Sequence, residues 1–142
     1  MTSVSFYKLS GNLQVALALV CQLTQKAMAA NQQVLCLVAD NDSAQQLDKL
    51  LWDFQASAFV PHGIGNQHHP IAITVDSDPG EHHGILINLR SQIPTWFSRF
   101  ERVMEIIYAQ PDYEQAKREN FKFYKERGYP LSFHDLTEKF KR

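Results

Sequence analysis

The run VLCLVA, residues 34–39, is the sequence feature that most limits how this chain can fold. It is continuously apolar over the length of one strand and lacks the alternation of a strand with one face in water. Runs of this kind are typical of strands covered on both faces, as in parallel sheets. Residues 13–30 precede it with apolar side chains every three or four positions, which predicts a helix.

The surrounding segments extend this pattern into an α/β order. Residues 4–9 (VSFYKL) are rich in strand formers, and residues 40–52 predict a second helix, with Ser43 and Gln46 spaced as a capping box. Two more strands are expected at 70–75 and 84–89. We therefore predict a mostly parallel, twisted sheet with right-handed crossovers and helices on both faces. A chain of 142 residues suits one domain, 1–142.

The second half of the chain gives mixed signals. Residues 93–100 could form a short helix or a helical turn. Residues 102–109 are ambiguous between helix and strand, and Ile-Ile-Tyr favours a strand. Pro111 suits the first turn of a helix and Gly128 the position just beyond its end, so we expect a helix over 111–127. The amphipathic tail is expected to lie against the body.

The sequence offers little support for catalysis or for a cofactor. The turn after the first strand, LSGNLQ, has one glycine and no phosphate-binding motif, so a mononucleotide-binding fold would here lack its phosphate loop. Four of the six histidines form adjacent pairs without a Cys or acid at a metal-binding spacing. No nucleophile motif is present. We therefore expect no cofactor, no metal and no enzymatic activity.

The chain also lacks signals for a membrane or for export. No apolar run approaches the ~20 residues needed to span a bilayer, and the N-terminus is unlike a secretory signal. Cys21 and Cys36 lie in apolar surroundings, as small core residues of a reducing compartment do. These features predict a cytoplasmic protein.

A charged aromatic stretch near the C-terminus is a first candidate binding site. Residues 110–142 hold eight Lys and Arg against six acids, although the whole chain has a formal charge of −1. On a helix, Arg118, Phe121, Lys122 and Lys125 would place a ring between cations on one face. This face could be solvated, or it could form a shallow pocket for an acidic peptide that ends in an apolar residue with a free carboxylate.

The segment LLWDFQASAFVPHG, residues 50–63, is a second candidate. It places Trp52, Phe59 and Pro61 where the chain should turn at the surface. These side chains could belong to the core at a helix end. They could instead form a protein interface, where aromatic residues are concentrated.

Three stretches together resemble one family. FYKL, LLWDFQASAFVPHG and KRENFKFYKERGY, in this order and at these separations, resemble the chi subunit of bacterial DNA polymerase III over nearly the whole chain. The resemblance implies a non-catalytic accessory of the clamp loader. It also implies two protein partners, the psi subunit and the acidic C-terminal tail of single-stranded DNA-binding protein, which ends in Pro-Phe. Association with DNA would then be indirect.

The resemblance also assigns residues to each partner. The psi-facing residues that it implies are Trp52, Phe59, Pro61 and His62. The tail-binding residues are Arg118, Phe121 and Lys122, and Lys125 lies one helical step further. An alternative is an accessory of a DNA-repair helicase that uses the same Trp52 and Phe59 surface.

Two positions depart from the family pattern at the tail site. In the family member compared, Tyr stands at the position of Phe121, and a basic residue aligns best with Glu114. Lys117 and Lys125 are the candidates to replace that lost charge.

Overall fold

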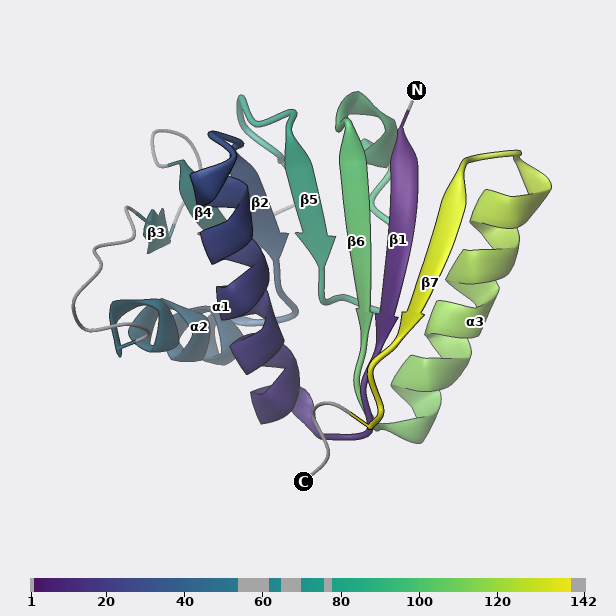
Figure 1. Ribbon diagram of the computed structural model, residues 1–142, viewed down its shortest axis with the longest axis horizontal. Helices are drawn as coiled ribbons and strands as arrows, with labels where there is room; N and C mark the ends of the chain where they lie inside the picture. The colour runs from purple at the N-terminus through teal and green to yellow at the C-terminus, as the bar shows by residue number, and fades with distance from the viewer. Residues whose placement is uncertain (1, 54–61, 65–69, 76–77, 139–142) are drawn as a thin grey trace.

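The structure is a computed structural model that describes residues 2–53, 62–64, 70–75 and 78–138 (Figure 1). The strands are β1 (Ser3–Lys8), β2 (Val34–Leu37), β3 (His62–Ile64), β4 (Ile71–Thr74), β5 (Ile85–Asn88), β6 (Arg102–Ile107) and β7 (Leu131–Asp135). The helices are α1 (Leu13–Ala29), α2 (Asn41–Asp53), α3 (Pro111–Glu126) and the short 3-10 helix η1 (Phe97–Arg99). The strands form one sheet in the order β3-β4-β2-β5-β6-β1-β7.

All pairs of neighbouring strands in the described residues run parallel. The α/β prediction is therefore confirmed, including a strand at 102–107 and a helix from Pro111. Two strands were missed. β3 has only three residues in a segment that was expected to be loop, and β7 lies in the tail, where four of its five residues are exposed.

The sheet has an apolar core on each face, because the side chains of each strand alternate between faces. One core joins the sheet to α1 and α2 and contains Tyr7, Leu17 and Cys36. The other joins the sheet to α3 and contains Phe6 and Tyr124. The two faces of β1 therefore serve different helices, as the prediction of helices on both faces requires.

Cys21 of α1 and Cys36 of β2 lie in the core between this helix and the sheet. Both are buried and reduced. Burial raises the pKa of the Cys21 thiol to about 12 and that of Cys36 further, so both stay protonated near neutral pH. They act as small apolar side chains, as expected.

Polar side chains fix where the helices begin. Asp40, and not the expected Ser43, caps α2: its Oδ1 accepts a hydrogen bond from the Ser43 backbone N–H at 2.7 Å. This interaction lowers the pKa of Asp40. The capping-box prediction was therefore wrong by three residues, because a better acceptor lies just upstream. Gln110 caps the N-terminus of α3. Gly128 lies just beyond the C-terminal end of this helix and has a left-handed φ of 77°, a conformation that favours glycine.

The single glycine after β1 has a packing role. A Cβ on Gly11 would lie 2.5 Å from Cγ2 of Val15 in α1. The next residue, Asn12, caps α1 by accepting from the Val15 N–H. Gly11 thus allows the strand-to-helix turn to approach the first turn of α1 closely.

Candidate functional site

A small pocket lies where α3 meets the edge of the sheet at β1 and β7. Its volume is about 260 Å³, and we call it the aromatic pocket. Its lining residues are Phe6, Lys8, Ile107, Glu114, Lys117, Arg118, Phe121 and Phe133. Figure 1 shows β1, β7 and α3 side by side. Because all three contribute lining residues, the pocket exists only when they are packed together.

Three phenylalanine rings build the apolar part of this pocket. Phe6 contacts Phe121 edge-on, with ring centroids 5.2 Å apart, and stacks against Phe133 at 6.5 Å. Phe121 and Phe133 meet edge-on at 6.2 Å. Phe6 is fully buried whereas Phe133 is 50% exposed, so the rings lead from the core to solvent. Such a surface can receive one apolar side chain of a ligand.

Two cations of the pocket are available to a ligand. The Arg118 Nη1 donates to Gln115 Oε1 at 2.8 Å, a neutral partner one turn earlier on α3. Lys8 is half-buried on β1. Within the described part of the chain, neither cation has a carboxylate oxygen within 4.0 Å. Among the residues that line this pocket, Glu114 is the acid.

The third cation, Lys117, is used inside the protein. Its Nζ donates to Glu105 Oε1 at 2.6 Å, to the Arg90 carbonyl at 2.7 Å and to the Asn88 carbonyl at 3.3 Å. Both side chains of the Lys117–Glu105 pair are completely buried. Burial lowers the pKa of Lys117, and the carboxylate of Glu105 opposes that shift. The suggestion that Lys117 replaces a lost charge at the ligand site was therefore wrong, because its ammonium is buried and donates to three acceptors inside the protein.

The Glu105 carboxylate is fully satisfied by its surroundings. Its Oε2 accepts from Tyr124 Oη at 2.9 Å and from Asn88 Nδ2 at 3.0 Å. Burial and this carboxylate raise the pKa of Tyr124, so its hydroxyl remains a donor. The network joins α3 to β5 and β6 through polar contacts that must all be made together. It fixes the helix that carries Arg118 and Phe121.

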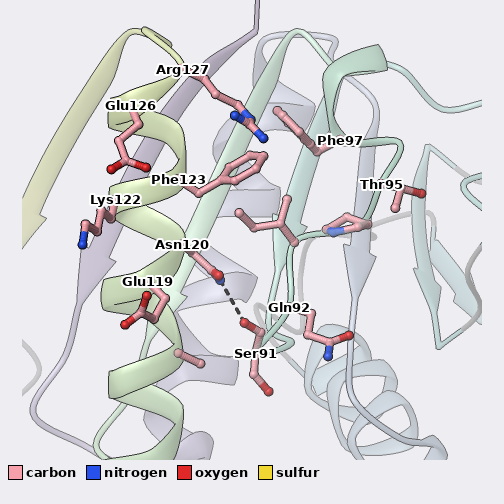
Figure 2. A pocket seen from close by; sticks show the side chains of 13 residues that line it. Ser91, Gln92, Thr95, Phe97, Glu119, Asn120, Lys122, Phe123, Glu126 and Arg127 are labelled. Carbon is pink, nitrogen blue, oxygen red and sulfur yellow. Dashed lines mark hydrogen bonds between the residues drawn. The ribbon is translucent and has the colours of Figure 1, made fainter.

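A larger groove of about 920 Å³ lies on the other side of α3 (Figure 2). It separates the helix from residues 91–97, and the Asn120 side chain donates across it to the Ser91 carbonyl at 2.9 Å. Arg127 lies over the Phe123 ring at 4.1 Å. Figure 2 shows Asn120 and Phe123 pointing towards residues 91–97, and Lys122 pointing away from them. The charged residues at this groove are balanced in sign, with Glu119 and Glu126 beside Lys122 and Arg127.

The expected tail-binding residues are thus divided. Arg118 and Phe121 meet in the aromatic pocket, whereas Lys122 lines the groove on the other side of α3. Lys125 lines neither cavity. The sequence reasoning missed Phe6, Lys8 and Phe133, which parallel pairing of β1 with β7 brings beside α3. Phe6 and Lys8 share one face of a strand by their spacing of two, a signal that the sequence did contain.

The second candidate surface lies at the opposite edge of the sheet. Trp52, in the last turn of α2, is 57% exposed, although its neighbour Leu51 is buried. Ile64 of β3, a strand in contact with α2, is 49% exposed. His62 begins β3 and is the register partner of Ile71. Phe59 and Pro61 lie outside the described residues.

Comparison with known proteins identifies the family. A family model described as DNA polymerase III chi subunit, HolC, matches residues 1–132. The chain belongs to this chi-subunit family. The DNA polymerase III subunit chi of Pseudomonas aeruginosa is 37% identical over 139 residues, covering 96% of this chain and 98% of that protein. The subunit chi of Escherichia coli K12 is 26% identical over 142 residues, covering 93% and 97%.

Membership of the chi family supports an accessory role in DNA replication, as the resemblance implied. The relatives are named as subunits of a polymerase complex, so this chain too is expected to associate with that complex. No helix in the described residues is long and apolar enough to cross a membrane. Within the same residues, no group of three or more His, Cys, Asp or Glu side chains could hold a metal ion.

Proposed function

We propose that this protein is a non-catalytic, cytoplasmic accessory subunit that links the clamp loader to single-stranded DNA-binding protein. In this proposal the psi subunit covers the surface around Trp52, and the aromatic pocket takes the acidic C-terminal tail of single-stranded DNA-binding protein. The observation that carries the proposal is the pocket itself: three phenylalanine rings with two available cations, in a member of the chi family.

The chemistry of the pocket suits a peptide end of that kind. The terminal Phe ring of the tail would pack on Phe121 and Phe133, and its carboxylate would meet Arg118. Charge-assisted hydrogen bonds of Arg to a carboxylate are about twice as strong as neutral ones. The aspartates earlier in the tail add a longer-range attraction that salt screens. Small interfaces of this type often bind in the micromolar range, about −8 kcal/mol.

The surface around Trp52 suits a protein partner. A large aromatic side chain that is 57% exposed, near the half-exposed Ile64, is typical of interface anchors. The family resemblance assigns Trp52, Phe59, Pro61 and His62 to psi.

Calorimetric titration with the peptide Asp-Asp-Ile-Pro-Phe tests the tail site. We expect micromolar binding to the wild-type protein, weakened by salt and abolished when the terminal Phe is deleted. Arg118→Ala should weaken binding tenfold or more, since a hydrogen bond to a charged group contributes about 1.5–3 kcal/mol. Lys125→Ala is the matched control, because Lys125 lies on the same helix outside both cavities. An affinity that changed neither with salt concentration nor on deletion of the terminal Phe would contradict the proposed site.

A further inference from the structure

Lys8 reaches the aromatic pocket from the sheet, opposite the helix that carries Arg118. It shares its strand face with Phe6, which is two residues earlier and forms the floor of the pocket. In the sheet its register partners are Ile107 of β6 and Asp135 of β7. The two available cations of the pocket therefore belong to different elements, one to β1 and one to α3.

The nearby acids leave the Lys8 ammonium available. Asp135 is its neighbour in the sheet, but its Oδ1 accepts from the Thr137 backbone N–H at 3.0 Å and from the Thr137 hydroxyl at 2.7 Å. These hydrogen bonds, and to a smaller extent the charge of Lys8, lower the pKa of Asp135. Glu114 faces the pocket from α3 without forming an ion pair with Lys8.

The other lysines of this part of α3 do not present their charge in the aromatic pocket. Lys117 and Glu105 neutralise each other in the core. Lys122 is exposed and is not among the residues that line the aromatic pocket. A carboxylate entering the aromatic pocket would thus meet Lys8 and Arg118 as the cations and Glu114 as the repelling charge.

We propose that Lys8 binds the terminal carboxylate of the peptide together with Arg118, and that Glu114 holds the affinity down. This inference rests on the proposed function, since it takes the same acidic peptide as ligand. It assigns part of the recognition to the sheet, so that the carboxylate lies between β1 and α3 while the terminal side chain lies on the rings. Two cations on different elements would orient the carboxylate as well as neutralise its charge.

Peptides with a free and an amidated C-terminus test this assignment. The variants to titrate are wild type, Lys8→Met, Lys8→Arg and the control Lys26→Met, whose exposed lysine lies on α1 across the sheet. Lys8→Met keeps an apolar stem of similar length. It should weaken binding of the free-acid peptide about tenfold and leave the amidated peptide nearly unchanged. Lys8→Arg should restore most of the loss, and Lys26→Met should bind as wild type.

Several results would overturn the assignment. If wild type and Lys8→Met bind the free-acid peptide equally well, Lys8 is not part of the site. The proposed tail binding would then still stand. An equal loss with both peptides would give Lys8 a structural role only. Failure of wild type to bind either peptide would instead contradict the proposed function itself.

Glu114→Gln tests the other half of the proposal. Removing a charge that lines an anion pocket should tighten the free-acid peptide severalfold, because the repulsion acts over a short, partly screened distance. Glu119→Gln, on the same helix at the opposite groove, is the matched control and should change affinity less. Unchanged or weaker binding by Glu114→Gln would show that Glu114 does not restrain the ligand.

Discussion

The two edges of the sheet are built in different ways. At the α3 and β7 edge, rings and charges are positioned by a buried polar network that joins the helix to β5 and β6. At the α2 and β3 edge, Trp52 is exposed and Ile64 is half-exposed, and α2 packs on the sheet through apolar side chains such as Leu47 and Leu51. The comparison shows that the side chains of the aromatic pocket lie on a helix fixed by buried polar contacts, whereas the opposite edge presents large apolar side chains to solvent.

Breaking the buried ion pair gives the strongest test of this difference. Lys117→Met leaves the Glu105 carboxylate buried without its cation, and such losses cost about 3–5 kcal/mol of the free energy of unfolding. Urea denaturation measures the change. The double variant Lys117→Met with Glu105→Gln should recover part of the loss, because no charge is then left uncompensated. A single variant as stable as wild type would show that the α3 edge does not depend on the network.

Truncating an exposed ring of the aromatic pocket should have an intermediate effect. Phe133→Ala removes a half-exposed side chain, so we expect a loss of about 1 kcal/mol in unfolding free energy, below the cost of a fully buried Phe. Binding of the free-acid peptide should fall much more than stability does, since Phe133 lines the pocket. Thermal denaturation and calorimetric titration of the same preparation separate the two effects. Wild-type peptide affinity in this variant would place the apolar part of the ligand elsewhere.

The opposite edge should show the smallest effect on stability. Trp52→Ala removes a mostly exposed ring, so the free energy of unfolding should change by no more than about 0.5 kcal/mol. Co-purification with psi should nevertheless be lost if psi covers this surface. A large fall in the unfolding midpoint would instead show that Trp52 belongs to the core, as the alternative interpretation of the sequence held.

The sequence predicted the elements whose signals are local. The apolar run at Val34–Leu37 predicted a central strand, and Pro111 with Gly128 predicted the ends of α3. β7 was not predicted, because its residues are mostly exposed and its place depends on pairing with β1, which is distant in the sequence. Without β7, Phe133 had no reason to be placed beside Phe121.

The charges were harder to predict than the elements. Lys117 and Lys122 stand in the same basic run, yet the first is completely buried and the second points away from residues 91–97 (Figure 2). Only the position of Glu105, a lone acid within an apolar strand, distinguishes them. An acid among apolar neighbours in a strand indicates that a cation must be buried beside it, and this signal was present in the sequence.

The place of β1 in the sheet has a consequence for how the protein is made. The first strand of the chain lies between β6 and β7, which come from its last third. During synthesis both edges of β1 therefore lack their partner strands until β6 and β7 have left the ribosome. Because β7 supplies Phe133 to the aromatic pocket, a nascent chain that still lacks β7 does not present the complete pocket that we propose as the peptide site.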